Sequence, residues 1–127
     1  MSVRTAVAAL LFLGIASASA AADPARGERV FQRCFSCHSV ADEPAKLQGP
    51  NLKGVVGRRA GTLPGFDYTD AMIAAGKSGL IWTRATLDRF IAAPDSVVPE
   101  TAMQPPPGLK DPAMRADVID YLEQAGR

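Results

Sequence analysis

Three residues that can form covalent bonds or bind a metal lie within five positions of one another. Cys34 and Cys37 are the two cysteines of this 127-residue chain, and His38 is its single histidine. A structural zinc site needs four Cys or His ligands, so the cluster cannot complete one alone. Its spacing leaves three possibilities: a redox-active dithiol, a simple disulfide, or C-x-x-C-H attachment of a c-type haem.

The haem interpretation explains all three residues together. On a helical segment, side chains three positions apart lie on one side, so both thiols can add to the vinyl groups of one haem. His38 comes four positions after Cys34 and would lie under the ring, where an imidazole nitrogen can bind iron. A redox dithiol belongs near a βαβ pattern, which this sequence lacks. We therefore predict one haem c attached through Cys34 and Cys37.

A sixth iron ligand must come from a residue other than histidine. The thioether candidates beyond Met1 are Met72, Met103 and Met114. Met72 and Met114 fall in predicted helices, whereas Met103 lies in a proline-rich loop that can present its sulfur to the opposite haem face. We predict Met103 as the ligand, with ordinary loop packing as the alternative. A thioether ligand raises the reduction potential relative to histidine.

Local signals divide the remaining chain into short helices joined by long loops. The predicted helices are one opened by Asp23-Pro24, a second over 68–75 ended by Gly76, a third capped by Thr83 and stopped before Pro94, and a last one opened by Asp111-Pro112. Residues 39–69 and 94–108 are rich in Gly and Pro and are predicted as loops. Without an alternating strand pattern, the fold class is all-α, with three to five short helices. The predicted core positions are Val30, Phe31, Leu87, Phe90, Ile91, Val118, Ile119, Tyr121 and Leu122.

The first 22 residues have the composition of an export signal. Arg4 precedes an apolar run over 6–16, which is shorter than the roughly 20 residues of a membrane span. Small residues follow, with Ala-x-Ala sites that end at Ala20 or Ala22. We predict cleavage near Ala22, which leaves a domain over 23–127 in the oxidising periplasm. An uncleaved N-terminal anchor is the alternative.

The charge balance argues against a nucleic-acid binder. The chain has 14 Lys and Arg against 13 Asp and Glu, and removal of Arg4 with the signal makes the two counts equal. A protein that binds nucleic acid through its phosphates carries a clear basic excess.

The order of motifs over the mature chain resembles the class I c-type cytochromes, the family of mitochondrial cytochrome c and its soluble bacterial relatives. The matching segments are Gly27-x-x-x-Phe31, Cys34-x-x-Cys37-His38, Gly49-Pro50-Asn51-Leu52, Gly54-x-x-Gly57-Arg58, Pro64-Gly65-Phe66-x-Tyr68-Thr69, Trp82, Pro94, Pro99-x-Thr101-x-Met103 and Asp117-Val118-Ile119-x-Tyr121-Leu122. The resemblance implies the cytochrome c fold, in which short helices and long loops wrap around one covalently bound haem.

The resemblance also implies roles at the haem. Cys34 and Cys37 correspond to the thioether anchors, and His38 and Met103 to the axial ligands. The Pro50 carbonyl would accept the ring N–H of His38 and so fix its tautomer.

Further matches imply a polar wall and a helix contact. Arg58, Tyr68 and Trp82 correspond to partners of a buried haem propionate, a group that is costly to bury without donors, and the Thr101 hydroxyl would lie nearby. Gly27 and Phe31 would pack against the last helix at Val118 and Tyr121, and Gly27 would allow close approach.

The implied function is that of a soluble electron carrier rather than an enzyme. The donor would be a membrane quinol-oxidising complex or a periplasmic dehydrogenase. The acceptor would be a terminal oxidase, a peroxidase or a photosynthetic centre, each met by a monomer in a transient complex.

The resemblance also implies a weak attraction to acidic partners. Arg33 keeps one positive charge at the haem edge, whereas Asp95, Ser96 and Ala102 stand where relatives often have lysine. The alternatives are a haem peroxidase-like or small-ligand-binding protein with a labile Met103 ligand, and a haem-free dithiol oxidoreductase.

Overall fold

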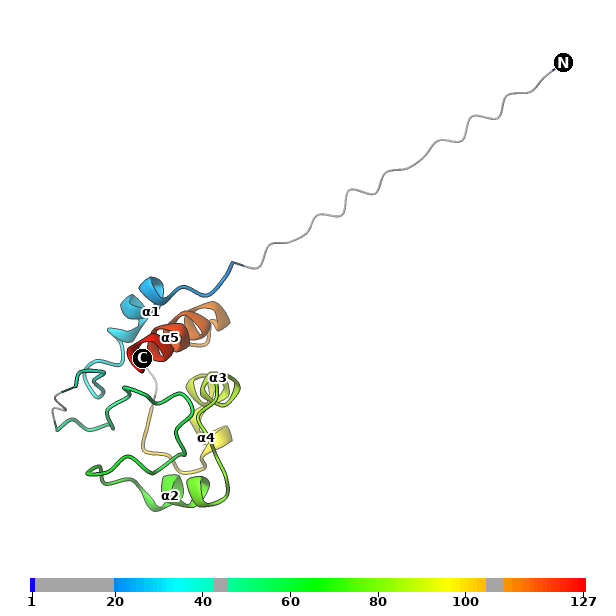
Figure 1. Cartoon of the computed structure of the whole chain (residues 1–127). Coiled ribbons are helices and arrows are strands. Elements are labelled where there is room, and N and C mark those ends of the chain that lie inside the picture. The colour runs from blue at the N-terminus through cyan, green and yellow to red at the C-terminus, as the bar shows by residue number, and fades with distance from the viewer. Residues whose placement is uncertain (2–19, 43–45, 105–108) are drawn as a thin grey trace.

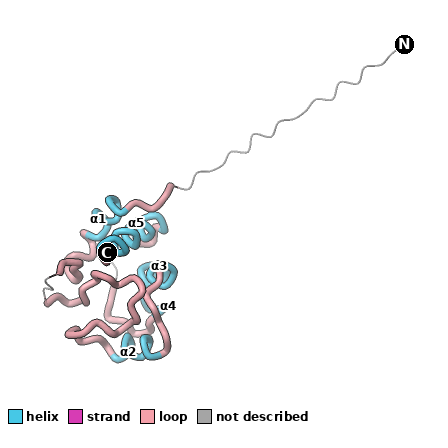
Figure 2. The backbone as a smooth tube through the Cα atoms, in the orientation of Figure 1, coloured by secondary structure: helices cyan, strands magenta, loops and turns pink. Residues whose placement is uncertain are grey.

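The computed structural model describes residues 1, 20–42, 46–104 and 109–127, and this part of the chain forms helices and loops but no β-strand (Figure 1). The helices are α1 (Pro24–Phe31), α2 (Asp70–Lys77), α3 (Arg84–Ala92), α4 (Pro94–Val97) and α5 (Pro112–Ala125). Loops of very different length join them (Figure 2), with only Ala93 between α3 and α4. The β pairing within the described residues is one isolated bridge between Arg59 and Ile81. The predicted all-α class with three to five short helices is confirmed.

Three helices begin where their capping residues predict. The side chains of Asp23 and Asp111 each accept the backbone N–H two residues later, at 2.8 Å, and a proline fills the next position in both helices. Thr83 accepts the N–H of Thr86 at the start of α3. These caps satisfy amide groups that the first turn of a helix leaves without partners.

The predicted boundaries of the second helix were wrong at both ends. The helix begins at Asp70, because the Thr69 side chain accepts the Met72 N–H and so acts as the cap. It then continues through Gly76 to Lys77. A Cβ atom at Gly76 would lie 1.9 Å from the carbonyl oxygen of Ala60, so this glycine permits close packing instead of ending the helix.

A short helix replaces the first part of the loop predicted over 94–108. Pro94 occupies the first position of α4, and the Ala93 carbonyl accepts both the N–H and the hydroxyl of Ser96. Pro94 therefore has two effects, since it ends one helix and its fixed φ suits the start of the next. The predicted loop residues 105–108 lie outside the described residues.

The first and last helices form the closest contact between elements, and they lie side by side in Figure 1. A Cβ atom at Gly27 would lie 1.9 Å from the Asp117 carbonyl oxygen and 2.8 Å from the Tyr121 Cβ. The rings of Phe31 and Tyr121 lie 5.3 Å apart, a favourable aromatic distance. The predicted contact of Gly27 and Phe31 with the last helix is therefore confirmed.

The core joins these two helices to α3. All the predicted core positions are buried except Tyr121, which is half-buried at the edge, and Trp82, Val98 and Leu109 join them. The apolar run predicted over 6–16 falls outside the described residues. Within the described part, no helix has the length and apolar character to cross a membrane.

Candidate haem-binding site

A cavity of about 490 Å³ lies beside this core, and it has the size of cavities that hold cofactors. All nine predicted site residues line it, namely Cys34, Cys37, His38, Pro50, Arg58, Tyr68, Trp82, Thr101 and Met103. Most of the other lining residues are apolar, among them Phe31, Leu52, Val55, Leu87, Phe90, Ile91, Leu109, Val118 and Leu122. The fold thus gathers residues from the whole length of the domain around one mostly apolar space.

Helical turns after α1 place the C-x-x-C-H segment on the cavity wall. The Cys34 N–H donates to the Phe31 carbonyl at 2.7 Å, and the His38 N–H donates to the Cys34 carbonyl at 2.9 Å. Both cysteines are free and half-buried at the cavity, so the disulfide alternative is not formed.

The electrostatics of Cys34 do not suit a redox dithiol. Burial raises the pKa of the Cys34 thiol, and the neighbouring Cys37 raises it further, while Arg33 opposes both. Catalytic dithiols have a lowered pKa, because the thiolate is the attacking form. This thiol is instead held neutral within an apolar cavity.

The His38 imidazole is fixed in the form that binds a metal. Its Nδ1 atom lies 2.8 Å from the Pro50 carbonyl oxygen. Since a carbonyl oxygen only accepts, Nδ1 carries the proton, and Nε2 of the neutral ring keeps its lone pair. Burial lowers the pKa of His38, and the hydrogen bond to Pro50 opposes this only in part, so the neutral form is favoured.

Gly49 limits the movement of this imidazole, a role that we did not predict. A Cβ atom at Gly49 would lie 2.3 Å from the His38 Cε1 and 2.6 Å from its Nδ1. The Gly49 N–H also donates to the Cys37 carbonyl at 2.8 Å. The only sequence signal for this role is the position of Gly49 directly before Pro50.

Two methionines line the cavity. Met103 is half-buried, and its N–H donates to the hydroxyl of the buried Thr101 at 3.3 Å, which shapes the turn that carries it. Met72 lines the same cavity from α2, although its sequence position indicated ordinary core or surface packing. Met114, on α5, is not among the lining residues.

A polar wall faces the same space. Arg58 is half-buried and donates to the carbonyls of Asn51 and Lys53, and the Tyr68 hydroxyl accepts the Leu63 N–H at 3.3 Å. These bonds hold a guanidinium and a phenol at an otherwise apolar cavity, an arrangement that suits an anionic group. Trp82 lies beside them at the cavity and is 7% exposed.

The donor set fits a haem better than a bare metal ion. Among the described residues, no group of three or more His, Cys, Asp or Glu side chains is placed to hold a metal. One imidazole and one or two thioethers cannot complete a site, so most of the iron ligands must come from the cofactor itself. The two free thiols, the neutral imidazole and the apolar wall match what a covalently attached haem requires.

Comparison with known proteins gives the family. The model of the cytochrome c family matches residues 24–126. The chain is 45% identical over 121 residues to cytochrome c2 of Rhodomicrobium vannielii, which covers 95% of this chain and 94% of that protein. It is 43% identical over 99 residues to cytochrome c type-1 of Ascaris suum, which covers 77% and 84%.

Solved structures agree with the sequence comparison. The structure of cytochrome c2 from Rhodospirillum centenum matches with a TM-score of 0.76 and 37% identity, over 83% of this chain and 99% of that chain. Cytochrome cH from Methylobacterium extorquens matches with a TM-score of 0.70 and 39% identity, over 80% and 98%. The chain therefore belongs to the cytochrome c family, as a cytochrome c2-like electron-transfer protein that carries one covalently bound haem c.

Proposed function

We propose that this protein is a periplasmic one-electron carrier in which His38 and Met103 would be the two protein ligands of the haem iron. The observation that supports this most directly is the fixed tautomer of His38, since Pro50 leaves Nε2 as the metal-binding atom. Met103 lines the same cavity on a turn held by Thr101. The proposal assigns the thioether bonds to Cys34 and Cys37.

The protein acts by holding the iron environment constant. When bound, haem c supplies an iron that cycles between Fe(III) and Fe(II). Pro50 and Gly49 restrict the imidazole of His38, and the turn at Thr101 restricts Met103. Ligands that stay in place in both oxidation states keep reorganisation small, and the apolar lining excludes water from the site.

The polar wall is proposed to bind a haem propionate. Arg58 supplies the positive charge and Tyr68 a hydroxyl, while Trp82 and Thr101 contribute an indole N–H and a second hydroxyl at the cavity. Charge-assisted hydrogen bonds of this kind are shorter and about twice as strong as neutral ones. They would offset the cost of burying a carboxylate.

Export and partners complete the proposal. Cleavage near Ala22 would release the domain over 23–127 into the periplasm. The donor is a membrane quinol-oxidising complex or a periplasmic dehydrogenase, and the acceptor is a terminal oxidase, a peroxidase or a photosynthetic centre. The near-neutral mature chain favours short-lived complexes with weak salt dependence. Phe35, between the two cysteines, is 62% exposed and offers an apolar contact for docking.

Absorption spectra with a redox titration test the proposal. The oxidised protein at neutral pH should show the weak far-red band of a thioether–iron bond, and the reduced protein should not bind carbon monoxide. A missing band together with rapid carbon monoxide binding would favour the peroxidase-like or ligand-binding alternative. A protein that loses its haem stain after denaturing electrophoresis would instead refute covalent attachment.

A further inference from the structure

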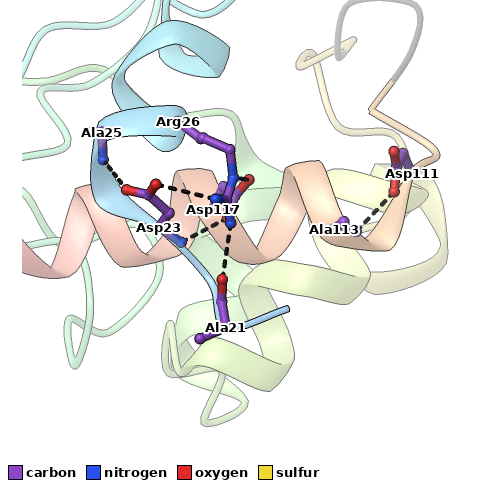
Figure 3. Close-up of polar contacts among 7 residues, drawn as sticks. All are labelled: Ala21, Asp23, Ala25, Arg26, Asp111, Ala113 and Asp117. Atoms are coloured by element: carbon purple, nitrogen blue, oxygen red, sulfur yellow. Dashed lines mark hydrogen bonds and ion pairs between the residues drawn. The ribbon is translucent and has the colours of Figure 1, made fainter. Parts of the chain in front are cut away.

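The first backbone amide of the folded domain points at a carboxylate of the last helix (Figure 3). The Asp23 N–H donates to Oδ1 of Asp117 at 2.7 Å. The Asp117 side chain is only 9% exposed. Arg26 holds the same carboxylate through two bonds, from Nε to Oδ2 at 2.9 Å and from Nη2 to Oδ1 at 3.1 Å.

This amide nitrogen is also the atom that one of the two predicted cleavage sites would release. Hydrolysis of the Ala22–Asp23 peptide bond consumes one water molecule, and it leaves a carboxylate on Ala22 and an amine on Asp23. An α-amino group has a pKa of about 8, so the new terminus takes up a proton at neutral pH. A neutral donor would thereby become a cation without any movement of its nitrogen.

We propose that the mature chain begins at Asp23 and that its terminal ammonium forms an ion pair with Asp117, which fastens α1 to α5. The proposal rests on the proposed export of the chain and does not depend on the ligands of the haem. It adds a structural consequence to processing, since the strongest form of this contact exists only after the signal is removed.

The charges around the nitrogen favour the pair. Before cleavage, the hydrogen-bonded cluster holds the carboxylates of Asp23 and Asp117 with the guanidinium of Arg26, which itself also pairs with Asp23. A terminal ammonium balances the second carboxylate. Arg29, on the next turn of α1, also attracts Asp117 and so competes with the ammonium for this carboxylate. The dipole of α1 opposes a cation at its N-terminal end, but a charge-assisted bond to a nearly buried carboxylate is the stronger effect.

The alternative cleavage site gives a different arrangement. Cleavage after Ala20 would place the ammonium on Ala21, which is exposed, and Asp23 would keep its neutral amide. The Ala21 carbonyl accepts a bond from Arg26 at 2.8 Å. Cleavage after Ala22 removes that acceptor, but water can replace it at an exposed position. The two starts therefore differ mainly in the charge on one nitrogen beside Asp117.

The first test identifies the terminus. The haem-loaded protein is exported with its own signal, and its intact mass and N-terminal sequence are determined. We expect a chain that begins with Asp23. A chain that begins with Ala21, or one that keeps the signal, would overturn the proposal.

The second test measures the ion pair by comparing two chain starts. One haem-loaded protein begins at Asp23, and the other begins at Ala21 because its signal is exchanged for one that is cleaved directly before Ala21. We expect the equilibrium constant for unfolding at pH 7 to be about fivefold to tenfold lower for the Asp23 start, since bonds to charged groups stabilise more than neutral ones. Equal constants would refute the pair.

The variant Asp117→Asn assigns the difference to its partner. In that background the two starts should unfold with the same constant, whereas the matched control Glu28→Gln, an exposed change on α1, should keep the difference. A difference that survives in Asp117→Asn would exclude Asp117 as the partner. Absorption spectra of all six proteins, the two starts in the parent, Asp117→Asn and Glu28→Gln backgrounds, should agree, so a failure here is distinct from a wrong assignment of the haem ligands.

If Asp117→Asn does not fold, a pH series tests the ion pair between the terminal ammonium and Asp117 instead. A carboxylate partner raises the pKa of an ammonium, so its stabilisation is present below about pH 8 and is lost as the pH rises through the folded-state pKa. The facing charged groups are Asp117 on α5, Asp23 at the N-cap of α1, and Arg26 and Arg29 on α1. Burial raises the pKa of Tyr121 on α5 above its usual value, so the phenol does not titrate first. A difference between the two starts that stays constant across this range would refute the ion pair.

Discussion

The backbone of Gly49 lies against the imidazole of His38, so closely that a Cβ atom at Gly49 would stand 2.3 Å from the His38 Cε1. The neighbouring ring atom, Nδ1, would lie 2.6 Å from that Cβ atom and is tied at 2.8 Å to the carbonyl of Pro50. Two consecutive residues therefore fix the ring, one by leaving no space and the other by a hydrogen bond. This pair explains why a Gly-Pro step follows the C-x-x-C-H segment.

Gly49→Ala should displace the imidazole of His38. The added methyl group overlaps the ring, so the ring or the loop has to shift and the bond to Pro50 is strained or lost. We expect lower haem incorporation during export and a reduction potential that differs from that of the parent protein. The measurements are haem content per polypeptide and a redox titration.

Gly54→Ala is the control for loss of a loop glycine, since no atom lies near its Cβ position, although its positive φ adds some strain. A Gly49→Ala protein with normal haem content and potential would show that the ring tolerates the methyl group.

Local signals predicted the starts of α1, α3 and α5 correctly because capping depends on neighbouring residues. Asp23, Thr83 and Asp111 bond to amides within three positions, so sequence alone identifies them. The roles of Gly49 and Gly76 depend instead on atoms that are distant along the chain, namely His38 and Ala60. No local rule distinguishes a glycine that ends a helix from one that admits another backbone.

The residues that line the cavity could be named from the sequence more fully than the contacts around it. The nine predicted site residues follow from a resemblance that covers the whole mature chain. The structure brings all of them to one cavity, and their roles at the haem stay predictions. Met72 was not among the predicted site residues, because a methionine in a helix is usually core or surface. Arg115 was missed because sequence gives no sign that a charged residue is buried, and only the fold brings its partners together.

Met103→Ala should leave the haem attached but open the sixth coordination position. Because Cys34 and Cys37 are unchanged, covalent attachment persists. Loss of the thioether should abolish the far-red band of the oxidised protein, lower the potential and allow carbon monoxide to bind the reduced form. Spectra and a redox titration measure all three effects.

Met72→Ala is the matched control, because Met72 is a second methionine at the same cavity. It should keep the far-red band and exclude carbon monoxide. If Met72→Ala loses the band and Met103→Ala retains it, the assignment of the axial ligand is reversed.

Gly27→Ala should destabilise the contact between α1 and α5. The methyl group would lie 1.9 Å from the Asp117 carbonyl oxygen. This oxygen belongs to the backbone of α5, so it cannot turn away from the methyl group as a side chain could. Overpacking of this kind costs about 1–3 kcal/mol, and we expect the upper part of that range. Denaturant unfolding followed by circular dichroism measures this loss in the free energy of unfolding.

The control is Glu28→Ala, on the exposed side of the same helix. It should change the free energy of unfolding by less than about 0.5 kcal/mol. Equal stability of Gly27→Ala and the parent protein would contradict the observed helix spacing.

Arg115→Ala should destabilise residues 109–111, which lead into α5. The side chain of Arg115 is 10% exposed, and it donates to Asp88 at 2.7 Å and to the carbonyls of Leu109 and Lys110 at 3.2 and 2.7 Å. Its removal leaves a buried carbonyl without its partner, so we expect a loss of about 2 kcal/mol. Denaturant unfolding at neutral pH provides the measurement.

Arg84→Ala is the control for removal of an arginine in general. Arg84 is 45% exposed and pairs with Asp120 and Glu123 on the surface of α5. Exposed pairs contribute at most about 1 kcal/mol. A loss for Arg115→Ala that does not exceed the loss for Arg84→Ala would show that burial adds nothing to the Arg115 bonds.

The stability of the protein in acid should depend on Asp117. The side-chain hydrogen bond from Arg26 is the main cause that lowers the pKa of the Asp117 carboxyl, with further help from the Asp23 amide. A carboxyl group whose pKa is lower in the folded state stabilises the protein at pH values above its unfolded-state pKa of about 3.9. This contribution is lost as the pH falls through the folded-state pKa.

The parent protein should therefore have a higher free energy of unfolding than Asp117→Asn at pH 6. The difference should shrink steadily below pH 4, because the parent carboxylate must then be protonated while the amide has nothing to titrate. Denaturant unfolding of both proteins at several pH values, with Glu28→Gln as the control for loss of one negative charge, measures the effect. A difference between the parent and Asp117→Asn that is unchanged from neutral pH to the acid limit would mean that Asp117 does not gain its stability through its charge.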